Sequence, residues 1–173
     1  ADAVKLAGHS CPTVAGAYLM VRSGLAALYG DDLPERGGIE VYLRDAREQG
    51  TTGVVATVAT LITGAAPETG FGGIGPAHRF ARRDLLHFDA PIAGLLALRR
   101  RDNRRGIVLD LDLADVPASP EMGTLLFKAI ADRASEAELS RFAALWQGRV
   151  EQMLLEHADD PELVRRTAWQ QAA

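Results

Sequence analysis

The spacing of apolar residues predicts a helix followed by a strand near the start of the chain. From Pro12 to Tyr29, apolar residues recur every three or four positions, which is the period of one helix face. Pro12 suits the first position of that helix, because an N–H has no partner there in any case, and Gly30 suits the residue that ends it. From Ile39 to Leu43, apolar and polar residues alternate as they do in a half-buried strand.

The middle of the chain predicts a second helix, a long loop and three short strands. Valine and threonine dominate from Thr51 to Thr63, but this run is too long for a typical strand and has no turn signal, so we interpret it as a buried helix. Glycine and proline are dense from Gly64 to Pro76, which indicates an irregular loop. The expected strands are Leu85–Phe88 and the two arms of a hairpin, Ile92–Leu98 and Ile107–Leu113.

Helical patterns dominate the last third. The segment from Ser119 to Glu121 starts one helix, and Ser135 with Glu138 forms the capping-box pattern of the next. The segment from Asp160 to Glu162 is expected to open a last short helix that includes Trp169. We expect these C-terminal helices to form a homodimer through their apolar faces. The apolar stripe of the long helix consists of Leu139, Phe142, Trp146, Val150 and Met153.

Composition narrows the class of protein only a little. A chain of 173 residues with 47% apolar and 24% charged residues is typical of a globular domain. The net charge of −4 argues against nucleic acid as a general partner. No apolar run approaches the length needed to span a bilayer, and no signal peptide is visible. We therefore expect a cytoplasmic protein whose N-terminus, which begins at Ala1, has been trimmed.

The segment from Gly8 to Pro12 carries the strongest chemical signal. Cys11 is the only cysteine, and it lies at the expected start of the first helix, where backbone N–H groups favour thiolate over thiol. His9 adds an imidazole two residues earlier. Thiolate and imidazole are ligands for zinc and other transition metals, but zinc requires at least one further protein ligand. His78, beside the glycine-rich loop, is the best candidate for that ligand.

This segment also carries a family resemblance. Gly-His-x-Cys-Pro at the start of an alanine-rich amphipathic helix resembles the E-subunit family of molybdenum formylmethanofuran dehydrogenase. The order of the elements that follow is similar over about residues 5 to 115, with Thr63-Gly64 at the end of the second helix and glycines at 70–75 in the loop.

The resemblance implies an α+β fold, with helix, strand, helix and three strands around one mixed sheet. It places this domain at residues 1–115. Many family members end in a cysteine-rich zinc ribbon, whereas the helical patterns of this chain predict that residues 116–173 form a helical extension packed on the domain. It also implies a metal site, expected to hold zinc or another transition metal, to which His9 and Cys11 contribute. The family name suggests an accessory role beside an oxidoreductase partner.

The chain departs from the family pattern in its ligands. Family members carry further cysteines at positions that correspond to about Val54 and Ala65, and neither of these side chains can bind a metal. We therefore hypothesise a site built from His9, Cys11 and His78, with an open position for water or a small ligand.

Three alternatives remain open at the level of the sequence. The first is a haem-binding protein in which Cys11 is an axial ligand and His9 or His78 binds the other face. The second is an enzyme that uses Cys11 as a nucleophile. The third is a protein that mediates interactions and in which an ancestral metal site has decayed.

Overall fold

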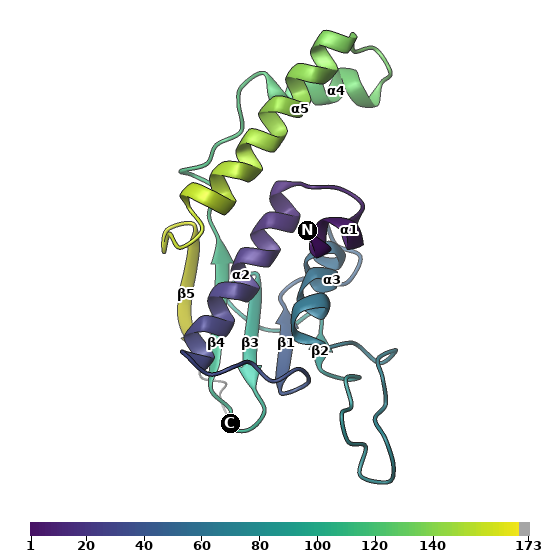
Figure 1. Cartoon of the computed structure of the whole chain (residues 1–173), viewed down its shortest axis with the longest axis vertical. Coiled ribbons are helices and arrows are strands. Elements are labelled where there is room, and N and C mark those ends of the chain that lie inside the picture. Colours follow the sequence, from purple (N-terminus) through teal and green to yellow (C-terminus); the bar gives the residue numbers. More distant parts are fainter. Residues whose placement is uncertain (170–173) are drawn as a thin grey trace.

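The computed structural model describes residues 1–169 and has an α+β fold, as expected. Helices lie in front of one five-stranded sheet in Figure 1, and two further helices project beyond it. The elements in chain order are α1 (Asp2–Ala7), α2 (Pro12–Tyr29), β1 (Ile39–Leu43), α3 (Thr52–Thr63), β2 (Leu86–His87), β3 (Leu96–Arg100), β4 (Gly106–Leu111), α4 (Met122–Ile130), α5 (Glu136–Glu151), the π-helical turn η1 (Gln152–Glu156) and β5 (Val164–Trp169).

The sheet is mixed, with the strand order β2-β1-β3-β4-β5. β2 pairs with β1 in parallel, whereas the β1–β3, β3–β4 and β4–β5 pairs are antiparallel. A parallel pair needs a crossover connection, and α3 together with the loop of residues 64–85 supplies it between β1 and β2. Helices α2 and α3 therefore cover the same face of the sheet.

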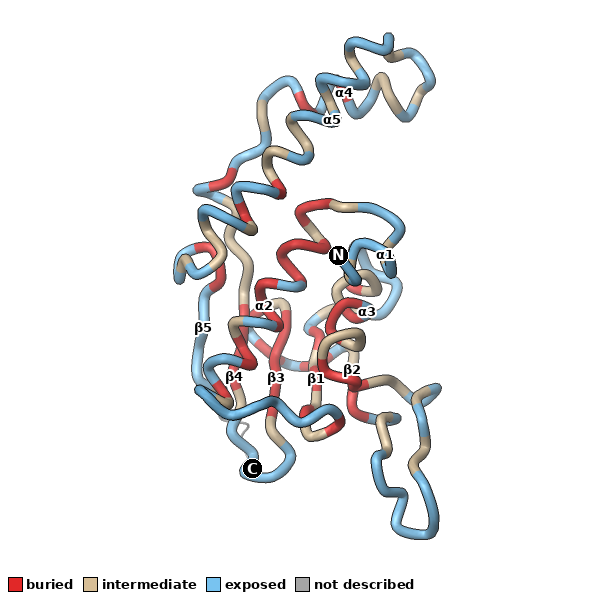
Figure 2. Tube along the Cα trace, in the orientation of Figure 1, coloured by how far each residue is buried: buried red, intermediate tan, exposed pale blue. Residues whose placement is uncertain are grey.

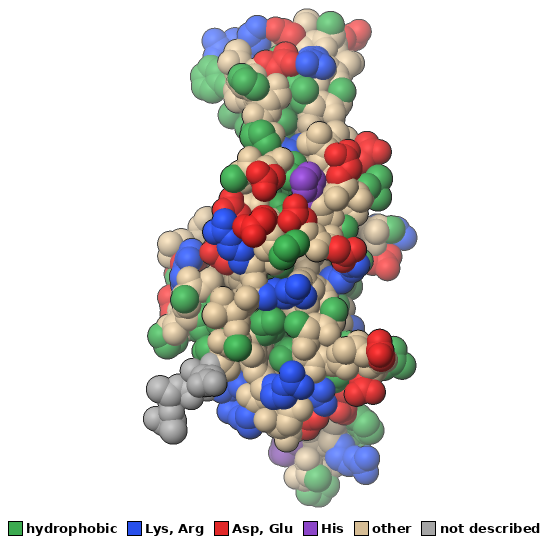
Figure 3. Space-filling model, turned by 90° about the vertical axis from the view of Figure 1, so that its left-hand side faces the viewer, with side chains coloured by type: hydrophobic (Ala, Val, Ile, Leu, Met, Phe, Trp, Pro, Cys, Tyr) green, Lys and Arg blue, Asp and Glu red, His purple; other side chains and the backbone are tan. Residues whose placement is uncertain are grey.

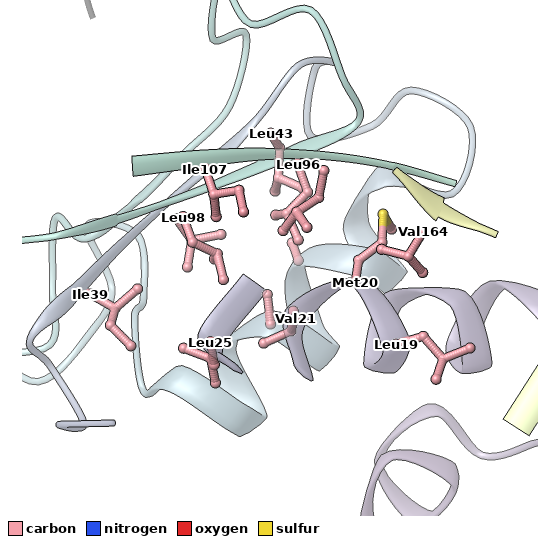
Figure 4. Packing of buried hydrophobic residues seen from close by; sticks show 14 of the residues in the cluster. Leu19, Met20, Val21, Leu25, Ile39, Leu43, Leu96, Leu98, Ile107 and Val164 are labelled. Carbon is pink, nitrogen blue, oxygen red and sulfur yellow. The ribbon is translucent and has the colours of Figure 1, made fainter. Parts of the chain in front are cut away.

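The core lies between α2 and the sheet. Figure 2 shows buried residues concentrated along α2 and the central strands. Figure 4 shows Val21 and Leu25 of α2 on the side of the helix that faces β3, where Leu96 and Leu98 lie, and Met20 beside Val164. The apolar period of α2 thus meets the inward positions of the central strands, as the sequence pattern predicts.

A glycine lets α2 approach the sheet closely. A Cβ atom at Gly24 would lie 2.7 Å from the Cδ1 atoms of both Leu98 and Leu109. Real Cβ atoms do not come this close to a neighbour, so the ends of these two leucine side chains, or the helix itself, would have to shift to accept a side chain.

The expected last short helix is wrong, because residues 164–169 form strand β5. Six residue pairs join β5 to β4, from Leu111 with Val164 to Gly106 with Trp169. Valine, threonine and tryptophan all suit a strand, and the free edge of β4 supplies hydrogen-bond partners that an isolated helix would not use. The C-terminal part of the chain therefore contributes to the sheet as well as to the helices.

Helices α4 and α5 form an arm that projects from the body of the molecule (Figure 1). The predicted capping box begins α5, since the Ser135 hydroxyl accepts from the Glu138 N–H and the Glu138 carboxylate accepts from the Ser135 N–H. The apolar stripe of α5 is buried only toward its end, at Val150, while Leu139 near its start is 45% exposed. The arm carries further exposed apolar residues, which Figure 3 shows as green surface near the top of the molecule.

Within residues 1–169, no helix combines the length and the apolar character that crossing a membrane requires.

Candidate functional site

Cys11 caps the N-terminus of α2. Its backbone is extended, with φ −152° and ψ 164°, and its Sγ accepts a hydrogen bond from the Val14 N–H at 3.4 Å. The residue is 6% exposed, and Pro12 follows at the first helical position as the sequence predicts. The thiol therefore has a fixed place at the positive end of an eighteen-residue helix.

His9 lies beside this helix start on a short connection from α1. Gly8 adopts the left-handed conformation that ends α1, with φ 78°, and so turns the chain toward α2. The His9 imidazole is exposed, and its Nδ1 lies 3.1 Å from the carbonyl oxygen of Ala7. That contact leaves Nε2 of the ring available to another partner.

His9 and Cys11 line one cavity of about 630 Å³. This volume falls within the range of ordinary small-molecule sites. The cavity lies where the N-termini of α2 and α3 meet the ends of β1 and β4. Its apolar wall consists of Met20, Leu43, Val55, Leu95, Leu111 and Leu113.

Helix α5 forms another wall of the cavity. Trp146 donates from Nε1 to the carbonyl oxygen of Ser10 at 2.8 Å, which ties the arm to the His9–Cys11 segment. Arg149, one turn further on, donates from Nε to the carbonyl oxygen of Val116 at 2.8 Å. The C-terminal part of the chain thus completes the site that the N-terminal part begins.

The start of α3 provides the polar side of the cavity. Thr51 and Thr52 line it, together with Asp45 from the end of β1. The carboxylate of Asp45 is already paired, because Arg44 donates to its two oxygens at 3.0 Å and 3.3 Å. That hydrogen bond and the attraction of the carboxylate raise the pKa of Arg44.

The structure does not bring His78 to His9 and Cys11. His78 lies in the loop of residues 64–85, which leaves the far end of α3 and extends away from the start of α2 (Figure 1). The loop folds on itself through two backbone hydrogen bonds between Ile74 and Arg79, at 2.8 Å and 3.1 Å. The His78 Nδ1 contacts the carbonyl oxygen of Gly72 at 3.0 Å within the same loop. The expected three-residue site is therefore not assembled.

A bare zinc ion does not fit the residues at this site. Across residues 1–169, no group of three or more His, Cys, Asp and Glu side chains is arranged to hold a metal. Zinc takes three or four protein ligands, whereas the cavity offers the His9 imidazole and the Cys11 thiol. A cofactor that brings its own ligands to the metal needs only one or two donors from the protein, and thiol and imidazole are donors of that kind.

Sequence reasoning identified two residues of the cavity and missed the others. The spacing of His9 and Cys11 at a helix start placed both at one site, because they are neighbours in the chain. Thr52 and Arg149 come from distant elements, and a threonine or arginine on a helix has no spacing signal of its own. Only the packing of α3 and α5 against the start of α2 brings them together.

Two comparisons by sequence find no relative of this chain. No protein-family model matches the chain, and no curated protein matches its sequence.

Proposed function

We propose that the protein is an accessory protein that binds a metal-containing cofactor in the His9–Cys11 cavity. The observation that carries the proposal is the placement of both side chains on one cavity of about 630 Å³. Cys11 and His9 would act as ligands to the metal of the cofactor, and the apolar wall would hold its organic part. The chemistry that a bound cofactor supplies is its own, while the chain binds and orients it.

The resemblance of the Gly8–Pro12 segment to the formylmethanofuran dehydrogenase E-subunit family supports the same proposal. It links a His-x-Cys site to a metal and to an oxidoreductase partner. We propose on this ground that the protein carries or inserts the cofactor for such a partner. The exposed apolar residues of the C-terminal helices support the further proposal that it does so as a homodimer.

Haem is one cofactor that this geometry favours. It carries its own four equatorial nitrogen ligands and accepts a thiolate or an imidazole from the protein. The apolar wall of Leu43, Leu95 and Leu111 suits a flat apolar ring. Hydrated Co²⁺ is a second probe, which reports on the thiolate alone, because water can fill its other positions and a bond from a thiolate to Co²⁺ gives an absorption band of its own.

The test is a titration of the purified protein with hemin and, separately, with Co²⁺, followed by absorption spectroscopy. We expect a shifted Soret band or a sulfur-to-cobalt band that saturates with the protein, and we expect Cys11→Ser to remove it. Serine is a good N-cap residue, so this substitution removes the sulfur while keeping the start of α2 intact. His9→Ala should weaken the same signal.

His78→Ala is the matched control. It removes an exposed imidazole from the distant loop and should leave both titrations unchanged. Equal spectra for the wild type and Cys11→Ser, or no spectral change with either probe, would refute the proposal.

A further inference from the structure

The polar side of the His9–Cys11 cavity has an excess of positive partial charge. Two helices of ordinary length, α2 and α3, begin at its wall, since Pro12 and Thr13 line it from one and Thr51 and Thr52 from the other. The N-terminus of a helix carries a positive partial charge and unpaired N–H groups. Part of each helix start is already paired, because Val14 N–H donates to the Cys11 thiol, and the N–H groups of Thr52 and Val54 donate to backbone carbonyl oxygens. Within residues 1–169, the N–H groups of Thr13 and Gly53 make no hydrogen bond.

Thr52 points independently to a ligand. The residue is 9% exposed and lines the cavity, yet within residues 1–169 its hydroxyl makes no hydrogen bond. The hydroxyl oxygen is not sealed off from solvent, since Arg82 Nη1 and not this oxygen is buried without a partner among the described residues. A hydroxyl that is open and unpaired at a cavity wall can donate a hydrogen bond to a bound molecule.

Arg149 supplies a full charge at the same cavity. Its Nε is used by the Val116 carbonyl oxygen, and in the described part of the chain its guanidinium has no carboxylate partner. The acid on the wall, Asp45, does not balance this charge, because Arg44 already pairs with it. A planar guanidinium with free N–H groups matches a carboxylate or phosphate geometrically.

We propose that the cavity binds a small molecule through an anionic group, a phosphate or a carboxylate, held by Arg149, Thr52 and the N-termini of α2 and α3. This inference rests on the proposed function, in that it assigns the charge of the ligand that enters the same cavity. The two ends of the ligand then have different chemistry: a metal centre beside Cys11 and His9, and an anionic group on the polar side. The positive charge of Arg149 would repel a bare metal cation, whereas it attracts a cofactor whose net charge is negative.

The test uses inorganic phosphate and acetate as separate probes, without metal, at constant ionic strength. Binding is followed by tryptophan fluorescence, because Trp146 lines the cavity. We expect a saturable change with phosphate, with acetate, or with both, and the probe that binds more tightly identifies the anionic group. Arg149→Gln should weaken binding about tenfold or more, which is the typical effect of losing a hydrogen bond to a charged group.

Two further variants keep the test decisive. Thr52→Val conserves the shape of the side chain and should also weaken binding, so the result does not depend on Arg149→Gln remaining folded. Arg141→Gln, which removes an exposed arginine of α5 that pairs with Glu121, should bind the probes as the wild type does. No saturable change with either probe, or equal affinity in wild type, Arg149→Gln and Thr52→Val, would overturn the inference.

Cys11→Ser separates this inference from the proposed function. It removes the metal ligand but leaves Arg149, Thr52 and both helix starts in place, so it should still bind the anion. If the wild type binds the anion but neither hemin nor Co²⁺, the anion site stands and the metal proposal fails. The reverse result retains the metal proposal and removes the anion site.

Discussion

At the scale of single residues, the start of α2 shows how one side chain serves both the fold and the site. Cys11 caps the helix through its sulfur, and the same residue lines the cavity. The sequence was sufficient to locate this residue, because Pro12 marks the first helical position. The sequence does not show where His78 lies: its imidazole has the chemistry of a metal ligand, but its loop leads away from the start of α2.

The hydrogen bonds of Glu138 predict how the stability of the protein changes at low pH. Hydrogen bonds from Lys128 and from the backbone and hydroxyl of Ser135 lower the pKa of Glu138 to about 2, from its ordinary value of 4.5. Because the pKa of Glu138 is lower in the folded state, its ionised carboxylate stabilises the fold above about pH 4.5, and this stabilisation is lost as the pH falls toward 2. We expect Glu138→Gln to remove this part of the acid sensitivity, as measured by the urea midpoint at neutral pH and at a pH within that window.

Glu136→Gln is the control, since Glu136 lies in the same first turn of α5 outside the capping box. It should retain the pH dependence of the wild type. A Glu138→Gln protein with the same pH dependence as the wild type would contradict the assigned role of Glu138.

At the scale of elements, local signals predicted the helices better than the strands. The bounds of α2 and the capping box of α5 follow from caps and apolar periodicity, which depend only on neighbours in the chain. Strand β5 had no such signal, because four of its six residues are exposed and only the edge of β4 defines it. The identity of a short edge strand thus depends on a partner that lies far away in the sequence.

A substitution at Gly24 tests how closely α2 packs against the sheet. A valine at this position would place atoms against Leu98 and Leu109, so we expect Gly24→Val to lower the free energy of unfolding by about 1–3 kcal/mol. Gly148→Val is the matched control, because no atom lies within 4 Å of the position of its Cβ. Valine has a slightly higher helix propensity than glycine, so the control should be neutral or weakly stabilising. Chemical denaturation of both variants measures the difference, and equal stabilities would contradict the close approach.

At the scale of the whole molecule, the arm formed by α4 and α5 exposes large apolar side chains to solvent. Phe127 is 61% exposed and Ile130 is 72% exposed, both on α4. Apolar patches of this kind mark surfaces of association. The homodimer expected from the C-terminal helices remains a prediction, and the arm locates where its interface would form.

Sedimentation velocity or light scattering tests the dimer. We expect the wild type to dimerise and the double variant Phe127→Asp with Ile130→Asp to be monomeric, since a charge buried in an apolar interface is strongly unfavourable. Leu33→Asp, which changes a side chain that is 94% exposed outside the arm, should not alter the molecular mass. A monomeric wild type, or a double variant that still dimerises, would exclude an interface on α4.

The pairing of β5 with β4 also has a consequence for how the protein is made. Residues 106–111 leave the ribosome well before residues 164–169, so the edge of β4 stays open while the arm is being synthesised. An open strand edge recruits any other strand that it meets, including one from a neighbouring nascent chain. The late arrival of β5 therefore leaves this edge unpaired while the arm is being synthesised, and we expect a chain truncated before residue 164 to aggregate more readily than the full chain.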